Sequence, residues 1–187
     1  MIELILWDMF FAALVSFGFA YASNPPTRIL FLSAFVAAIG HGFRFTLLEF
    51  FHIQNLAIAT FLAAFVVGCL GMVLAKVSKT PAEIIAFPAL LPMIPGIYAY
   101  RAILYLFNFI NADAVEAKTR YLVEFFDYFF TTLSVTLALA VGVSVTLLIF
   151  FEQSFMTTRH SGLFGKYRHI VSQKANKPNA TKPLKFK

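Results

Sequence analysis

Charged residues are scarce in this sequence. Only 13% of its 187 residues are Asp, Glu, Lys or Arg, whereas 60% are hydrophobic and 17% are aromatic. A soluble domain carries about 25% charged residues, roughly twice this share. The 24 phenylalanines would also give a soluble fold of this size a large exposed apolar surface. We therefore exclude a soluble protein and predict an all-α, polytopic membrane protein.

Residues that bind metals or form disulfides are also few. The single cysteine, Cys69, excludes an intramolecular disulfide framework and a thiolate metal cluster. Glu49 and His52 have the spacing of half a di-iron motif, but the sequence holds no second copy of it. No nucleophile–base pair or phosphate-binding loop is recognisable. We predict no metal, no cofactor and no enzymatic activity.

Positive charge is concentrated at the C-terminal end. Residues 152–187 hold eight of the 15 Lys and Arg residues but only one acid, whereas residues 1–151 are nearly neutral. Nucleic-acid binding needs a basic folded surface, so we exclude a nucleic-acid partner. We expect a membrane-embedded domain over 1–151. A flexible, basic cytoplasmic tail over 152–187 would lie beside anionic membrane lipid.

Apolar runs predict about five transmembrane helices, because one crossing needs roughly 20 apolar residues. The predicted spans are 4–22, 29–51, 55–75, 80–110 and 128–151. With five crossings, the flanking cations place the N-terminus outside and the C-terminus in the cytoplasm. A re-entrant fourth stretch would change this parity. Of the residues between the last two spans, 111–120 are predicted to form an outer loop.

Small residues form stripes on the third and fifth spans, and we interpret these stripes as helix-packing interfaces. The striped residues are Ala64, Gly68, Gly71 and Ala75, then Thr131, Ser134, Ala138, Gly142 and Thr146.

Prolines interrupt the fourth stretch, and each removes a backbone hydrogen-bond donor. They are Pro88, Pro92 and Pro95, the last followed directly by Gly96. We predict two half-helices, 81–91 and 97–110, that meet near the middle of the membrane. The order Thr80-Pro81-Ala82-Glu83 predicts a capping box at the start of the first.

The second half-helix predicts a carboxylate site, since its N-terminus would direct free N–H groups and partial positive charge into the break. Arg101 lies one turn inside that helix. Discontinuous helices of this kind hold substrates in many transporters. A kinked structural helix with Arg101 turned outward is the alternative. The predicted substrate-binding residues of this segment are Pro92, Pro95, Gly96, Tyr98, Tyr100 and Arg101.

Two ionisable residues share a face of the second span. His41 and Arg44 are three residues apart, and both would be costly against lipid. We predict that they contribute to the substrate path, with His41 as a possible proton relay. In the alternative, Arg44 pairs with an acid such as Asp8 or Glu49.

These motifs resemble the C-terminal membrane half of the threonine/serine exporter family. The similarity rests on NPPTR at 24–28, SKTPAE at 78–83 and PMIPGIYAYRA at 92–102, and extends over about residues 5–150. The resemblance implies that residues 1–151 are a transporter half in the bacterial inner (plasma) membrane. Its activity would be secondary, proton-driven export of small carboxylate-bearing metabolites.

In this family the two halves form one chain or two polypeptides, and this sequence resembles the short subunit of the split form. The resemblance therefore implies a second membrane polypeptide with the other half, although a homo-oligomer stays open. The substrate is threonine or serine, or a C4 dicarboxylate such as succinate. A non-transporting accessory or scaffold subunit, or a channel, remains an alternative.

Overall fold

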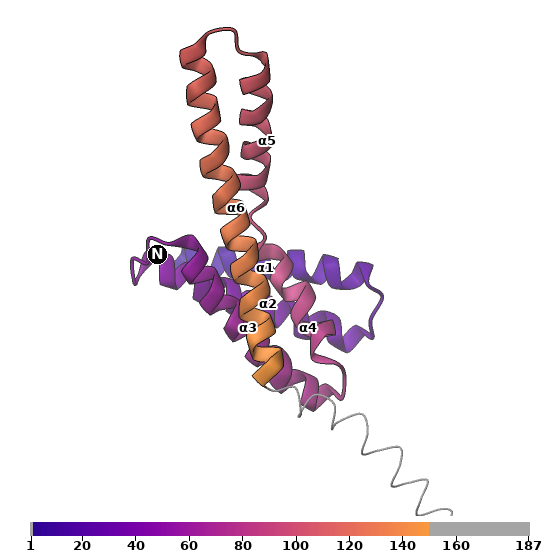
Figure 1. The fold of residues 1–187 in the computed structure, drawn as a ribbon. Coiled ribbons are helices and arrows are strands. Elements are labelled where there is room, and N and C mark those ends of the chain that lie inside the picture. Colours follow the sequence, from indigo (N-terminus) through magenta and orange to yellow (C-terminus); the bar gives the residue numbers. More distant parts are fainter. Residues whose placement is uncertain (1, 150–187) are drawn as a thin grey trace, which may run out of the picture.

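The structure is a computed structural model that describes residues 2–149, and these form helices joined by short connections (Figure 1). The elements are α1 (Ile2–Ala22), α2 (Thr27–Glu49), α3 (Leu56–Ser78), α4 (Ala82–Leu90), the short 3-10 helix η1 (Leu91–Met93), α5 (Gly96–Asn111) and α6 (Val115–Ile149). No strand occurs among residues 2–149, so the all-α prediction is confirmed. The predicted basic tail lies outside the described residues.

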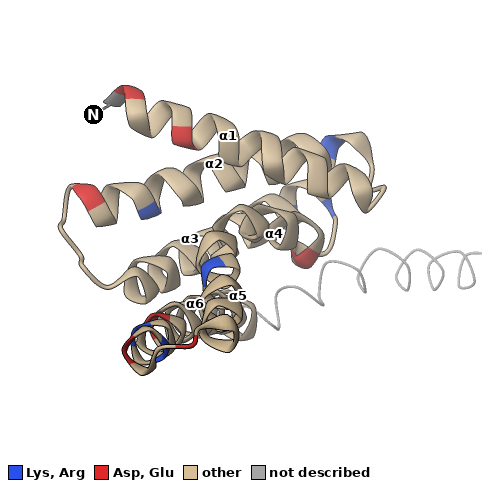
Figure 2. Cartoon of the chain, turned by 90° about the horizontal axis from the view of Figure 1, so that it is seen from above, with Lys and Arg blue, Asp and Glu red and all other residues tan. Residues whose placement is uncertain are grey.

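Membrane-spanning length is reached by four single helices, α1, α2, α3 and α6. The pair formed by α4–η1 and α5 passes the same test as one unit, bent by 49°. The prediction of about five spans is therefore confirmed. Figure 2 shows how few charged positions lie along α1–α4.

One predicted boundary is wrong. The expected loop over 111–120 shrinks to three residues, because α6 begins at Val115 and runs for 35 residues. The apolar run that locates a span says nothing about where its helix starts. Residues 115–127 mix good helix formers with charges, and they gain a partner in α5, where Tyr105 packs against Tyr121 at 6.3 Å.

Glycines let α3, α4 and α6 approach closely, as the stripes predict. A Cβ on Gly68 would lie 2.8 Å from Thr146, and one on Gly142 would lie 2.7 Å from the Phe61 carbonyl oxygen. Gly71 meets Ala86 of α4 in the same way. The contacts on α6 advance in the same order as those on α3, so the two helices run in the same direction. The chain between them, α4 and α5, therefore returns toward the N-terminal end of α3.

The predicted half-helices are confirmed as α4 and α5, with the break at Ile94 and Pro95. The predicted capping box is wrong, since α4 begins at Ala82 and its N-cap, Pro81, has no side-chain bond. The Thr80 hydroxyl instead lies 2.8 Å from the Ser78 hydroxyl. The left-handed residue Lys79 ends α3, and this turn directs Thr80 back toward α3 rather than into α4.

A hairpin of α5 and the first half of α6 stands apart from the other helices (Figure 1). Among the helices of residues 2–149, the only substantial packing partner of α5 is α6. Seen from above, α1 and α2 extend across the view while α5 and α6 are nearly end-on (Figure 2). The molecule thus has two regions: a helix bundle of α1–α4 with the second half of α6, and a projecting hairpin. We refer to them below as the bundle and the hairpin.

Candidate functional site

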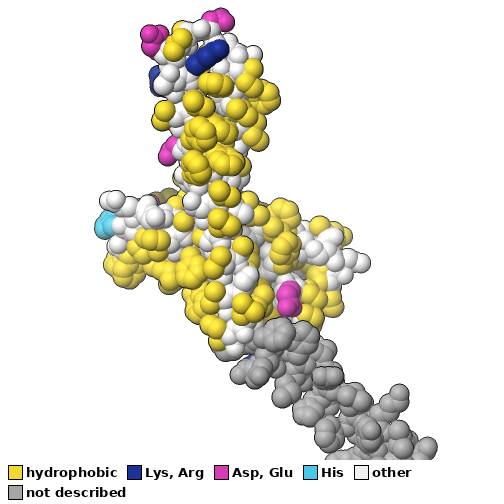
Figure 3. Space-filling model, viewed as in Figure 1, with side chains coloured by type: hydrophobic (Ala, Val, Ile, Leu, Met, Phe, Trp, Pro, Cys, Tyr) yellow, Lys and Arg dark blue, Asp and Glu magenta, His cyan; other side chains and the backbone are white. Residues whose placement is uncertain are grey.

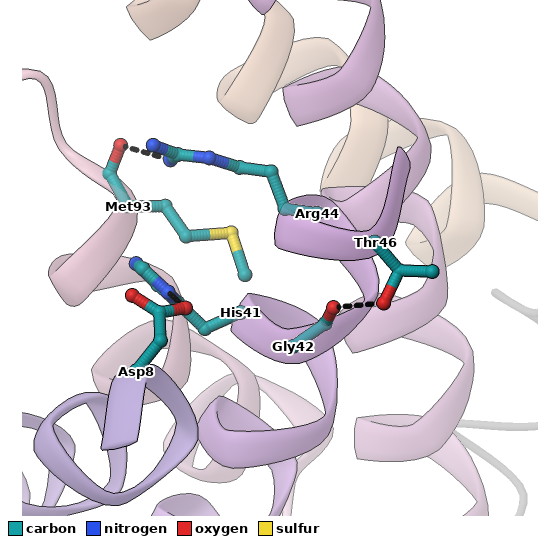
Figure 4. A network of polar contacts seen from close by, with 6 residues as sticks. All are labelled: Asp8, His41, Gly42, Arg44, Thr46 and Met93. Atoms are coloured by element: carbon teal, nitrogen blue, oxygen red, sulfur yellow. Dashed lines mark hydrogen bonds and ion pairs between the residues drawn. The ribbon is translucent and has the colours of Figure 1, made fainter. Parts of the chain in front are cut away.

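The break between α4 and α5 is held by Arg44 of α2. The Arg44 guanidinium donates a hydrogen bond from Nη1 to the Met93 carbonyl oxygen at 3.1 Å. That carbonyl belongs to the last residue of η1, where the helical hydrogen-bond pattern stops. Figure 4 shows the Arg44 side chain extended toward it, with the Met93 side chain between Arg44 and His41. A charged donor thus lies where the backbone opens.

A histidine–carboxylate pair lies one turn away. His41 Nδ1 and Asp8 Oδ2 are 2.5 Å apart, and the two side chains are only 17% and 27% exposed (Figure 4). Asp8 comes from α1 and His41 from α2, so the pair joins the first two helices. The alternative in which Asp8 or Glu49 pairs with Arg44 is not what forms, because the direct partner of Asp8 is His41.

The first turn of α5 opens onto free space. No side chain caps it: the Gly96 N–H donates to the Ile94 carbonyl at 2.8 Å, and the Ala99 N–H to the Pro95 carbonyl at 3.1 Å. No atom lies within 4 Å of the place where a Gly96 Cβ would be, while Pro95 is buried and Pro92 half-buried. The predicted half-helix N-terminus is therefore present and accessible.

Tyr98, in this first turn, borders a polar groove between the bundle and the hairpin. Its volume is about 460 Å³. The lining residues are Gln54, Asn55, Leu56, Ala57, Tyr98, Asp127, Phe130, Thr131, Ser134 and Val135. Tyr98 also lies within electrostatic reach of Arg44. It therefore connects the break to the groove.

Arg101 and Tyr100 lie elsewhere. Arg101 is exposed, and its guanidinium donates to the Tyr128 hydroxyl at 3.2 Å while its Cζ lies 5.5 Å from the centre of the same ring. Tyr105 stacks on the same Tyr128 ring, with the two ring centres 5.4 Å apart. Tyr100 is 64% exposed. Among the predicted site residues, the structure thus brings Arg44, Pro92, Pro95, Gly96 and Tyr98 around the break and leaves Arg101 and Tyr100 on the hairpin.

Several polar residues near the break were not among the predicted ones. Asp8 gives a signal, since it is an acid inside an apolar run. Asp127 and Tyr128 give none, because they lie where the sequence predicts only the beginning of a span. Gln54 and Asn55 read as loop residues, and only the folded chain places them beside α5 and α6.

A helix bundle with four to five spans around a broken helix defines a polytopic α-helical membrane protein. The sequence pattern of the family described as "Threonine/Serine exporter, ThrE" matches residues 8–149, so this chain belongs to the threonine/serine exporter family. That family is one of membrane transporters, which are not an enzyme class.

A relative in Haemophilus influenzae, an uncharacterized protein, is 32% identical over 150 residues. The match covers 80% of this chain and 48% of the relative, so the chain spans about half the length of this curated relative. No solved structure is a significant match.

Proposed function

We propose that this chain is one half of a secondary exporter of small carboxylate-bearing metabolites. The observation that carries the proposal is Arg44, a charged donor inside a membrane helix that binds the carbonyl of a broken helix. A charged arginine inside the membrane costs free energy unless groups of the protein or of the substrate bind its guanidinium. A planar guanidinium also matches a carboxylate in geometry and charge. The substrate carboxylate would take the place beside Arg44 and the free N-terminus of α5.

The predicted residues then take different parts in the site. Arg44 binds the carboxylate, and Pro92, Pro95 and Gly96 keep the α5 amides open to it. Tyr98 orients the substrate from the groove side. Arg101 and Tyr100 belong to the hairpin, where their surroundings would be completed by a second polypeptide.

The surface of the hairpin supports the proposal that a second polypeptide carries the other transporter half. Five charged residues fall within 116–127, a density that lipid does not tolerate on all sides. Yet the hairpin exposes many large apolar side chains, which water does not favour (Figure 3). These are Ile97, Ile103, Leu104, Phe107, Ile110, Leu122, Val123, Phe126, Phe129 and Phe130. The relative in Haemophilus influenzae supports such a partner, because the matched 150 residues are 48% of its length and the remainder is enough for a second half of similar size.

Several finer features belong to the same proposal. Export is driven by the proton gradient across the bacterial inner membrane, with the N-terminus outside and the C-terminus in the cytoplasm. An odd number of spans agrees with the parallel directions of α3 and the second half of α6. Threonine and serine are the favoured substrates, and C4 dicarboxylates such as succinate are the alternative.

The scaffold alternative is weakened by one observation. It would use the small-residue stripes to clamp another protein, but Gly68, Gly71 and Gly142 already contact helices of this same chain. The efflux experiment described next distinguishes a homo-oligomer from an assembly with a second polypeptide.

The test is efflux from loaded vesicles containing this chain alone or with the other half co-expressed. Vesicles hold labelled serine, threonine and succinate, with and without a pH gradient. Saturable, gradient-dependent efflux that needs both halves supports the proposal. Efflux from this chain alone would identify a homo-oligomeric exporter. A flux that neither saturates nor depends on the gradient would indicate a channel, and no flux from an assembled pair would indicate a scaffold.

A further inference from the structure

Asp8 and His41 form a partly buried pair of ionisable side chains that carboxylate binding does not use. It joins α1 to α2 at 2.5 Å, with both side chains mostly shielded. His41 precedes Arg44 by three residues on the same helix, so the two lie on one face. Asp8 is also within electrostatic reach of Arg44. A change of charge on the pair therefore acts directly on the residue that holds the break.

Few other ionisable groups face this pair within the described chain. From α2 there is Arg44, and from α5 there is Tyr98, which also interacts with Arg44. Gly40, the residue before His41 on α2, lies against Val67 of α3 and Met93 of η1. The Asp8–His41 pair is therefore at the same height in the bundle as these two residues. The titratable residues of α3 and α4 are Cys69, Lys76 and Glu83, and the two charged ones lie toward the opposite end of the bundle.

The charges of the cluster favour exchange of a proton for an ammonium group. With His41 neutral, the carboxylate of Asp8 and the guanidinium of Arg44 are the two complementary charges of a zwitterion site. Since His41 Nδ1 faces Asp8, a further proton binds at Nε2 and makes His41 a cation. That imidazolium neutralises Asp8 through a charge-assisted hydrogen bond and leaves no net negative charge for a second cation.

We propose that a proton on His41 and the ammonium group of the substrate compete for Asp8, so that the site exchanges one proton for one zwitterionic amino acid. This inference rests on the proposed function and adds its coupling device. A proton from outside binds His41 Nε2 and the ammonium leaves Asp8. On the cytoplasmic side the proton leaves Nε2 and the next substrate binds between Asp8 and Arg44. Each cycle moves one positive charge inward and one neutral zwitterion outward.

A dicarboxylate behaves differently at this site. Succinate has no ammonium group to compete with His41, and its second carboxylate would be repelled by Asp8. Protonation of His41 should therefore weaken the binding of serine but not that of succinate. The pH dependence of affinity separates the two substrate classes.

The test uses the transport-competent assembly in proteoliposomes, with serine as the probe. Serine counterflow at equal pH on both sides measures substrate exchange, and an internal pH dye measures coupled proton movement. In the wild type we expect serine affinity to weaken as the pH falls, approaching about tenfold per pH unit, as single-site competition with a proton requires. Succinate affinity should lack this dependence.

The informative variant is His41→Gln, with His52→Gln as the matched control. His52 is an exposed histidine in the connection between α2 and α3, outside the cluster, and its variant should behave as the wild type. His41→Gln should still exchange serine at a measurable rate, because Asp8 and Arg44 remain. It should lose the pH dependence of affinity and the proton movement. Asp8→Asn should weaken serine binding at every pH.

Several results would overturn the inference. One is proton movement coupled to serine in His41→Gln, another is wild-type serine affinity independent of pH. If His41→Gln loses both exchange and coupling, the swapped variant, Asp8→His with His41→Asp, decides between two explanations. Restored coupled transport in the swapped variant supports the inference, whereas its failure assigns the pair a purely structural role and overturns the inference. Failure of the proposed function is a different result: no wild-type counterflow at all.

Discussion

The bundle and the hairpin share one helix, α6, but the two halves of this helix differ in burial. The buried residues of α6 are Val135, Leu139, Gly142 and Thr146, all in the half that packs in the bundle. In α5, the other helix of the hairpin, Ala102 is the only buried residue within the described structure. The second half of α6 is packed against helices of its own chain, whereas α5 leaves most of its apolar surface uncovered. Residues of similar composition can therefore serve internal packing or association, depending on what surrounds them.

The two membrane-region arginines repeat this contrast. Arg44 is partly buried and binds a backbone carbonyl freed by the break. Arg101 is exposed and rests on the ring and hydroxyl of Tyr128. A guanidinium in the bundle has few ways to be satisfied other than a fixed partner or a substrate. One on the hairpin can be satisfied by water or by a partner, so its removal should cost less.

The largest effect is expected from Gly142→Leu in the bundle. A Cβ at this position would lie 2.7 Å from the Phe61 carbonyl oxygen and 2.8 Å from the Ala64 Cβ. Overpacking costs about 1–3 kcal/mol, and more when backbone must move. We expect loss of the monodisperse peak in gel filtration after detergent extraction. Gly18→Leu is the control, because no atom lies within 4 Å of its Cβ position. Equal elution of both variants would show that α3 and α6 are not tightly packed.

The second effect separates the two arginines. Arg44→Ala should lower serine counterflow by about tenfold or more, because hydrogen bonds to charged groups contribute about 1.5–3 kcal/mol. Arg101→Ala should change it by no more than about twofold, as expected of an exposed ionic group. Arg44→Lys keeps the charge but loses the planar fork, so it should be intermediate. A larger loss in Arg101→Ala than in Arg44→Ala would put the carboxylate on the hairpin.

The third effect concerns the uncovered surface of the hairpin. Replacing Phe126 and Phe130 by serine should weaken association with the other half by about fivefold or more, the cost of losing an interface anchor. The two rings stack on each other at 5.9 Å and are both exposed. Co-purification of the two halves measures the effect. The matched control replaces Phe10 and Phe11, two exposed phenylalanines of α1. If both pairs weaken association equally, the hairpin is not the specific interface.

The smallest effect is expected at the border between the two regions. The Asn55 side chain accepts hydrogen bonds from the Ala57 and Ile58 N–H groups at 3.0 and 3.3 Å and so caps α3. Asn55→Ala should cost about 1 kcal/mol, which corresponds to a decrease in Tm of about 2–4 °C. Asn55→Ser should retain most of the stability. No difference in Tm between Asn55→Ala and Asn55→Ser would show that this cap contributes little.

Much of the bundle is predictable because its signals are local. Apolar runs reveal the spans, and the proline positions reveal the break between α4 and α5 almost to the residue. The stripe glycines of α3 and α6 are recognised by spacing, and they lie in the predicted interfaces. The start of α6 is missed because residues 115–127 are amphipathic. Their helix is stabilised by pairing with α5, which no window along the chain detects.

The candidate site is predictable only in part. The sequence indicates a break open to a carboxylate, and it ranks Arg101 above Arg44 because Arg101 is closer along the chain. In the fold Arg44 reaches Met93 from 49 residues away and His41 meets Asp8 from 33 residues away, whereas Arg101 donates to Tyr128. The partner of Asp8, the place of Asp127 and the groove are found only when α1, α2, α5 and α6 are in place.

The sequence by itself determines that this protein is a helical membrane protein, how many spans it has and where one of them breaks. These properties depend on transfer of apolar side chains into lipid and on the missing N–H groups of proline, which act over a few residues. The tertiary structure decides which arginine serves the break, which acid pairs with His41 and which apolar surface stays uncovered. Those outcomes depend on helix packing, which joins residues far apart in the chain and so leaves no pattern in any single segment.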